Sequence, residues 1–133
     1  MMNPTNTFRK LKFDSSKRNL IMNAPQDFLE ILKGASFESA YSETDKHSYD
    51  FVQIFAVSLD ELQKLVSQMA HAGKYDCLFW ICYPKGGGKI KSDIKRDVAW
   101  DVFALAGLRP VAQIAIDETW SALRGRPSEL VGK

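Results

Sequence analysis

Residues 51–83, FVQIFAVSLDELQKLVSQMAHAGKYDCLFWICY, decide the fold of this chain. The stretch opens and closes with nearly continuous apolar runs, Phe51–Val57 and Cys77–Tyr83, which are too short for helices and typical of strands covered on both faces. Between them, the capping-box pattern SLDE at 58–61 starts an apolar repeat with the helical period, and Gly73 ends it. A strand, a helix and a strand in this order predict two parallel neighbours in one sheet.

The flanking sequence continues the alternation of strands and helices. Apolar periodicity, Pro at a helix start and Gly at a helix end predict the remaining elements, which are a strand at 19–24, a helix at 26–33, a weaker strand at 37–41, a third helix from Ser92 or Asp93 to Ala106, and a hairpin of strands at 110–117 and 120–126. This order favours a Rossmann-like α/β fold, a mostly parallel three-layer sheet with helices on both faces and a C-terminal antiparallel hairpin. We expect one domain at 9–126, a disordered lead at 1–8 and a free tail at 127–133.

Composition excludes several classes of protein. The 133 residues, 45% hydrophobic and 26% charged, are ordinary globular material, and no apolar run approaches the roughly 20 residues of a membrane-spanning helix. No apolar run follows a basic flank at the start, so we expect a cytoplasmic protein with no membrane partner. A net charge of +2 argues against nucleic acid as a partner. Cys77 and Cys82 fall on opposite faces of one strand, so we expect inert thiols, with no disulfide and no metal site.

Ligands of open α/β sheets bind outside the carboxyl ends of the strands, where the order of connections reverses. In this chain the rule selects the residues that follow each strand, namely Asn23, Ser58, Tyr83, Lys85, Asp117, Thr119 and Trp120. The side-chain amide of Asn23 either hydrogen-bonds a ligand or caps the helix beside Pro25, and capping is the commoner use of Asn there.

The loop KGGGKIKSD, residues 85–93, is rich in lysine and glycine. Lys85, Lys89 and a third lysine, together with exposed backbone amides and a following helix N-terminus, are the ingredients of a phosphate cradle. Ile90 stands where the Walker pattern has the Ser or Thr that binds magnesium, and Asp93 would repel an anion if it caps the helix. The loop therefore either binds an anionic small molecule or is a flexible solvated segment.

The predicted hairpin turn carries Asp117, Glu118, Thr119 and Trp120. Its carboxylates can act as acid and base, and the indole can stack on a planar ligand. Turn chemistry favours the alternative, in which Asp117 organises the turn and Trp120 plugs the end of the sheet.

Trp100 lies nearly opposite the apolar stripe of the third helix, which consists of Ile94, Val98, Val102 and Leu105. Either the N-terminal segment covers this indole, or Trp100 marks a contact with another chain and thus a homodimer. His47 sits in a polar loop, and we expect its side chain to be exposed.

Several short motifs carry a resemblance to a family of small bacterial proteins of unknown function. They are NAP at 23–25, YPK at 83–85, Asp93 and DETWSAL at 117–123, in the order in which that family has them. The resemblance covers residues 9–126, and it implies no known activity.

More remotely, the layout resembles the class I methyltransferase fold, whose last two strands also form an antiparallel hairpin. That resemblance implies a glycine-rich loop after the first strand, which lets the backbone approach S-adenosylmethionine. Here residues 23–28, NAPQDF, hold no glycine, and Pro25 lacks an amide proton. We therefore expect no S-adenosylmethionine and no other cofactor.

Three functional hypotheses follow. The first is a non-catalytic binding or accessory module for an anionic small molecule or a protein partner. The second is a methyltransferase-like transferase with a modified cofactor loop, in which Asp117 and Lys85 act at the carboxyl ends of the strands. The third is a homo-oligomeric interaction protein joined through the face that carries Trp100.

Overall fold

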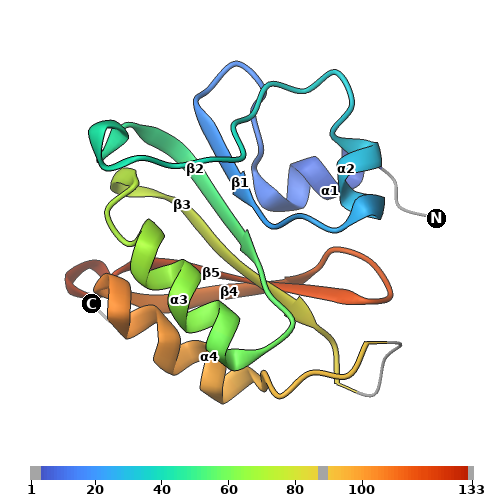
Figure 1. The fold of residues 1–133 in the computed structure, drawn as a ribbon, viewed down its shortest axis with the longest axis vertical. Coiled ribbons are helices and arrows are strands. Elements are labelled where there is room, and N and C mark those ends of the chain that lie inside the picture. Colours follow the sequence, from blue (N-terminus) through green and yellow to red (C-terminus); the bar gives the residue numbers. More distant parts are fainter. Residues whose placement is uncertain (1–3, 87–89, 132–133) are drawn as a thin grey trace.

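The computed structural model describes residues 4–86 and 90–131. Its centre is a five-stranded sheet in the order β1-β2-β3-β5-β4, with helices packed on both faces (Figure 1). The strands are β1 (Asn19–Met22), β2 (Tyr49–Phe55), β3 (Gly73–Pro84), β4 (Leu108–Ala115) and β5 (Trp120–Pro127). The α/β class predicted from the sequence is confirmed.

The sheet is mixed, with β1, β2 and β3 parallel and β5 antiparallel between β3 and β4. β2 lies inside the sheet and is buried on both faces, because Val52 and Ile54 enter one core while Phe51 and Phe55 enter the other. This explains the continuous apolar run at its position in the sequence. The edge at which β1, β2 and β3 end is called the carboxyl edge below, and the opposite one the amino edge.

The helices form the outer layers. On one face lie α3 (Leu59–Met69) and α4 (Arg96–Val102), and on the other α1 (Pro4–Leu11) and α2 (Gln26–Ile31) (Figure 1). The described residues also form three short 3-10 helices: η1 (Glu43–Asp45), η2 (Phe103–Ala106) and η3 (Ser128–Leu130). Within the described ranges, no helix is long and apolar enough to cross a membrane.

The ends of the chain are more regular than the sequence predicts. From residue 4 onward, the expected disordered lead forms α1, whose Thr7 and Leu11 are 4% and 0% exposed. The indole nitrogen of Trp80 donates to the carbonyl oxygen of Leu11 at 3.0 Å, which anchors this helix to β3. Likewise, η3 replaces part of the expected free tail at 127–133. A single turn or two of helix gives too short an apolar pattern to be recognised in sequence.

The third helix begins later than predicted. α4 starts at Arg96, with Lys95 at the N-cap position, because Ser92 and Asp93 bond to the start of α3 instead. It continues as η2, and Gly107 ends it with a left-handed backbone of φ 71°, as expected.

Three local predictions are wrong. The weak strand at 37–41 reduces to one parallel bridge between Leu20 and Glu38. Gly73 begins β3 rather than ending α3, which stops at Met69. Leu105, placed in the buried stripe, is 53% exposed, because the change to a 3-10 helix turns Phe103 inward in its place.

β3 bulges out near its start. Tyr49 of β2 pairs with Gly73, but Phe51 pairs with Leu78. More residues of β3 than of β2 therefore lie between the two pairs. Residues 74–77 lie opposite Asp50 alone, so three of them are extra, and the segment projects at the amino edge.

An ion pair holds the bulge, and close packing restricts its first residue. The guanidinium of Arg126 donates to both carboxylate oxygens of Asp76, at 2.9 and 2.7 Å. A Cβ atom at Gly73 would lie 2.2 Å from the sulfur of Cys77, so any larger residue there would have to displace that side chain. Cys77 and Cys82 pack in opposite cores, as the strand period predicts, and burial raises the pKa of each thiol to about 12.

Candidate functional site

The turn after β1 is built around Asn23. Its backbone has φ 62°, a left-handed conformation that glycine adopts most readily and that Asn tolerates. Its side-chain amide donates to the carbonyl oxygen of Phe55 at 2.8 Å and so joins the ends of β1 and β2. The prediction that Asn23 caps α2 is wrong, since Pro25 occupies the N-cap position. The backbone thus follows a path suited to glycine, while the exposed side chain of Asn23 bridges the ends of the two strands.

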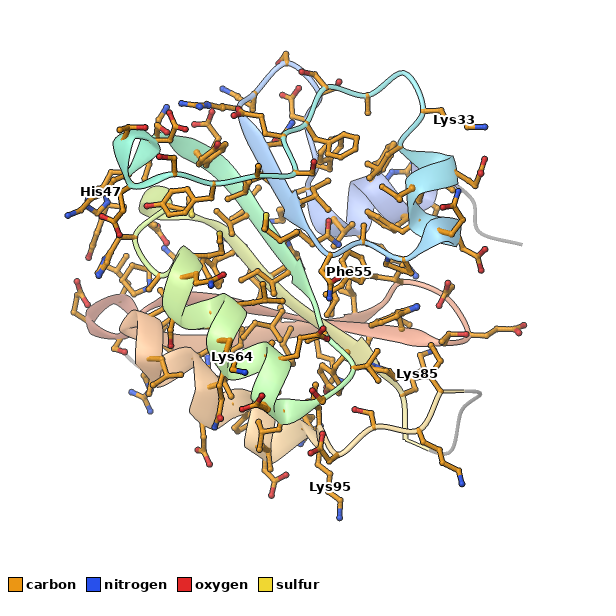
Figure 2. The ribbon with its side chains drawn as sticks, viewed as in Figure 1. Lys33, His47, Phe55, Lys64, Lys85 and Lys95 are labelled. Atoms are coloured by element: carbon orange, nitrogen blue, oxygen red, sulfur yellow. The ribbon has the colours of Figure 1, made fainter. Side chains whose placement is uncertain are left out.

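Three aromatic side chains, called the aromatic plug below, fill the carboxyl edge on the α2 face. They are Phe28, Phe55 and Trp120, whose exposed fractions are 1%, 1% and 7%. The ring centroids of Phe28 and Phe55 are 5.0 Å apart, and Trp120 meets Phe55 edge-on at 5.2 Å. Phe55 lies among the side chains gathered at this end of β2 (Figure 2). The indole of Trp120 is therefore packed inside the protein, and it offers no open face for stacking on a ligand.

The hairpin turn is organised by Asp117. One oxygen of its carboxylate accepts from the backbone N–H groups of Thr119 and Trp120, at 2.8 and 2.7 Å. The carbonyl oxygen of Thr119 accepts from the backbone N–H of Lys85 at 2.8 Å, which fixes the turn to the end of β3. The structure thus gives Asp117 and Trp120 the turn and plug roles that turn chemistry favours, while Glu118 is exposed.

The N-terminus of α3 is closed by the chain's own side chains. The hydroxyl of Ser58 accepts from the backbone N–H of Glu61 at 3.2 Å, and the carboxylate of Asp93 accepts from that of Leu59 at 2.7 Å. The predicted capping box is modified, since the Glu61 carboxylate accepts from the backbone N–H of Val57 rather than from that of Ser58. Ser58 and Asp93 therefore serve the helix end, and Asp93 caps α3 rather than the third helix.

The remaining residues of the carboxyl edge differ in access. Tyr83 is 4% exposed on the α3 face, where burial raises the pKa of its phenol. Lys85 is half-buried, whereas Lys91 and Lys95 are exposed, and Figure 2 shows Lys85 and Lys95 at the same end of the molecule. Lys89 lies outside the described residues. The edge thus combines a closed apolar interior with a cationic rim.

Trp100 is 45% exposed on the outer side of α4. The N-terminal helix does not cover it, since α1 packs on the opposite face of the sheet. The guanidinium of Arg96 lies over the indole instead, 5.3 Å from the ring centroid.

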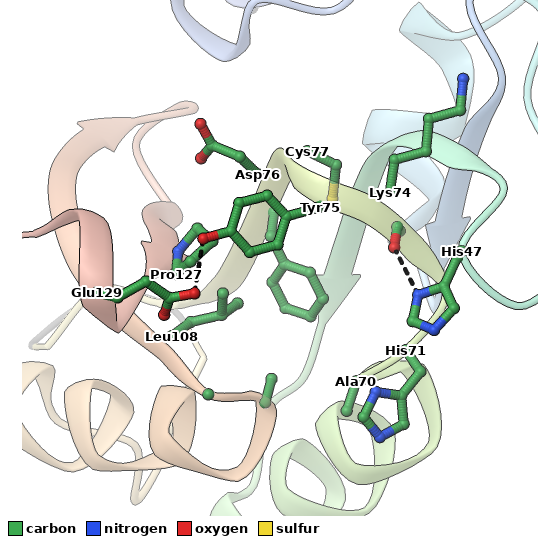
Figure 3. A pocket seen from close by; sticks show the side chains of 14 residues that line it. His47, Ala70, His71, Lys74, Tyr75, Asp76, Cys77, Leu108, Pro127 and Glu129 are labelled. Carbon is green, nitrogen blue, oxygen red and sulfur yellow. Dashed lines mark hydrogen bonds between the residues drawn. The ribbon is translucent and has the colours of Figure 1, made fainter.

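A pocket of about 360 Å³ opens at the amino edge, on the side opposite to the one selected from the sequence. Its walls come from the turn after α3, the bulge of β3, the junction of η2 with β4, and the end of β5. Figure 3 shows Tyr75, Leu108 and Pro127 on one side of it, and His47 and His71 on the other.

Backbone hydrogen bonds tie the pocket walls together. The N–H of His47 donates to the carbonyl oxygen of His71 at 2.8 Å, and the N–H of Ser128 donates to that of Gly107 at 3.1 Å. Sequence reasoning missed this site. His47 is exposed as expected, but nothing in its local sequence shows that residues 47, 71, 75 and 108 converge.

Solved structures identify the fold. The chain is similar to a SAM-dependent methyltransferase from Aquifex aeolicus, with a TM-score of 0.57 and 11% identity over 93% of this chain and 89% of that one. It is also similar to geranyl diphosphate C-methyltransferase from Streptomyces coelicolor, with a TM-score of 0.59 and 8% identity over 92% and 78%. A third similar structure is the [4+2]-cyclase SpnF, with a TM-score of 0.59 and 9% identity over 93% of this chain and 79% of that one. This chain has a methyltransferase-like fold.

The sequence itself gives no such link. No protein-family model matches the chain, and no curated protein matches it in sequence. The resemblance to a family of small proteins therefore rests on its motifs alone. At these identities the structural likeness establishes the fold, and one fold hosts many activities.

Proposed function

We propose that this chain is a non-catalytic binding domain, a methyltransferase-like scaffold whose cofactor edge its own side chains have closed. The observation that carries the proposal is the aromatic plug, together with the amide of Asn23 bound to Phe55. A ligand entering beside β1 would have to displace buried rings and break this hydrogen bond.

S-adenosylmethionine is the group to test, because similar folds belong to proteins that use it. The residues after β1 do not fit it. Where the fold has glycines that let the cofactor approach the backbone, this chain has the side chains of NAPQDF, and Pro25 offers no N–H. The turn of Asn23 keeps a left-handed backbone, yet it carries an exposed side chain that bonds across to Phe55 where a glycine would have none.

The charge of the surface supports an anionic ligand or an acidic protein partner. Lys91 and Lys95 are exposed beside the half-buried Lys85, and none of these three amines forms an ion pair within residues 4–86 and 90–131. Cationic surfaces raise the local concentration of anions and steer them toward the protein. The module would thus collect its ligand by charge rather than transform it.

Isothermal titration calorimetry with S-adenosylmethionine and S-adenosylhomocysteine tests the proposal. We expect no binding heat from the wild-type chain. Asn23→Gly is the matched variant, because it keeps the backbone conformation and removes only the amide that bonds to Phe55. Saturable binding to the wild type would overturn the proposal.

A transferase with a modified cofactor loop is the second candidate, and the methyltransferases of similar fold favour it. It predicts methyl transfer from labelled S-adenosylmethionine, and loss of that transfer in Lys85→Ala. A homodimer is the third candidate, favoured by exposed Trp100 and Leu105 on neighbouring turns. Sedimentation of the wild type beside Trp100→Ala tests it, and a wild-type monomer at every concentration would exclude it.

A further inference from the structure

We infer that the pocket at the amino edge binds a small organic acid, with a flat apolar body on the Tyr75 side and its anionic group at His47 and His71. The inference rests on the proposed binding function, and it names the ligand class and a site away from the carboxyl edge. Its volume of about 360 Å³ falls within the range of small-molecule pockets.

One side of the pocket suits a flat apolar body. Leu108 and Pro127 line it beside the ring of Tyr75, and Phe79 contributes a further buried ring. Tyr75 is 68% exposed, which is unusual for a large aromatic side chain. Its hydroxyl donates to the carboxylate of Glu129 at 2.6 Å, so the ring is held in place as a wall. An exposed ring fixed in this way offers a stacking face.

The other side suits an anion. The imidazole rings of His47 and His71 meet edge-on with their centroids 5.9 Å apart, and imidazole N–H groups donate to carboxylates and phosphates. The Nδ1 atom of His47 bonds the carbonyl oxygen of Gly73 at 3.4 Å, which leaves its Nε2 atom and the ring of His71 for the anion (Figure 3). The acidic lining residues, Asp76 and Glu129, stand on the Tyr75 side in Figure 3. Both are engaged, Asp76 with a guanidinium and Glu129 with the phenol. No carboxylate therefore competes for the two imidazoles in the part of the pocket that the structure describes.

Two residues of the pocket have a strained backbone, which supports a ligand site here. His47 and Asp76 have φ of 59° each, in the left-handed region that residues other than glycine seldom adopt. Such residues persist only where their surroundings hold them, and they cluster at ligand sites. Here the hydrogen bond from His47 to His71 and the paired bonds from Arg126 to Asp76 provide that hold. The site is thus formed before any ligand arrives.

A metal ion fits the two histidines less well than an organic anion does. A stable site needs three or more protein ligands, and no group of at least three His, Cys, Asp or Glu side chains is placed to bind a metal within the described residues. Zinc binding is therefore an outcome that would contradict the inference.

The test uses 8-anilinonaphthalene-1-sulfonate as a fluorescent probe that joins flat rings to one anion. Its neutral control is N-phenyl-1-naphthylamine, which lacks the sulfonate. We expect one sulfonate probe to bind per folded chain. The double variant His47→Asn/His71→Leu should weaken it about tenfold, and the neutral probe less than about twofold. Asn at position 47 tolerates the left-handed backbone, and circular dichroism checks the fold of each variant.

Two further variants address the apolar side. Ala106→Phe fills the pocket, and Tyr75→Ala removes an exposed wall at little risk to folding; both should weaken both probes. Trp100→Ala removes an exposed aromatic ring outside the pocket and should change neither affinity. The inference fails if the pocket variants bind the sulfonate probe as tightly as the wild type does. It also fails if the neutral probe binds the wild type as tightly as the sulfonate probe does and loses as much affinity in the histidine variant. Displacement of the probe by zinc would contradict it as well.

S-adenosylhomocysteine separates this inference from the proposed function. If S-adenosylhomocysteine binds without displacing the probe, the closed carboxyl edge is refuted and the inference about the pocket is unaffected. Unchanged probe binding in Tyr75→Ala and Ala106→Phe, with no binding of S-adenosylhomocysteine, would refute the pocket and leave the closed edge standing.

Discussion

Replacement of Phe55 by Ala removes the central ring of the aromatic plug. The side chain is 1% exposed and contacts the rings of Phe28 and Trp120 at centroid distances of 5.0 and 5.2 Å. Truncation of such a ring costs about 3–5 kcal/mol, from lost burial and from the cavity left behind. A chain of this length has a free energy of unfolding of about 7–20 kcal/mol. If the wild type lies in the middle of that range, the variant remains folded after this loss.

Urea unfolding followed by tryptophan fluorescence measures the loss. With an unfolding entropy of about 2.1 cal/mol/K per residue, the same change lowers Tm by about 11–18 °C. Trp100→Ala is the control, because that ring is 45% exposed and its removal should cost about 1 kcal/mol or less. A loss below about 1 kcal/mol for Phe55→Ala would mean that the rings do not pack against one another, and the reasoning for a closed carboxyl edge would fail.

Three more predictions follow from contacts elsewhere in the fold. Gly73→Ala should destabilise the chain by about 1–3 kcal/mol, because the new Cβ meets the sulfur of Cys77, and Cys77→Ala should recover most of this loss in a double-mutant cycle. Additive effects of the two changes would contradict the clash. Asp93→Ala should cost about 0.5–2 kcal/mol in urea unfolding, since the backbone N–H of Leu59 loses its acceptor; an unchanged midpoint would contradict the capping role. The guanidinium of Arg18 donates to both carboxylate oxygens of Glu38, at 2.7 and 3.1 Å, and holds the pKa of that carboxyl below its usual range. The stabilising effect of Glu38 is therefore present above about pH 4.3 and is lost as the pH falls through the lowered folded pKa. Glu38→Gln should flatten this part of the acid dependence of the urea midpoint, and an identical profile would refute it.

The sheet could be predicted from the sequence because its signals are local and redundant. Phe51–Val57 and Cys77–Tyr83 are apolar throughout, and the helix between them carries its own cap at Ser58. The hairpin could be predicted because Asp117 supplies turn chemistry between two β-forming runs, and the structure has that turn. The parallel pairing of the strands on either side of that helix then follows from general rules of chain connection.

The candidate sites were harder to predict, since they depend on contacts between distant residues. The sequence places Asp93 at the start of a helix, but the structure gives its carboxylate to Leu59, 34 residues earlier. The amide of Asn23 likewise bonds 32 residues away instead of capping its own helix. The pocket depends on the β3 bulge and on the left-handed backbone of His47, and neither feature has a local signal in the sequence.

The measurement that tests the closed carboxyl edge most directly is a titration of the ¹⁵N-labelled chain with S-adenosylhomocysteine, followed by the backbone amide resonances. We expect the amide resonances of Asn23, Ala24 and Phe55 to keep their positions at saturating nucleoside. Saturable shifts at these three amides would show that the cofactor edge opens, and would contradict the claim that the chain is a binding domain without the methyltransferase cofactor.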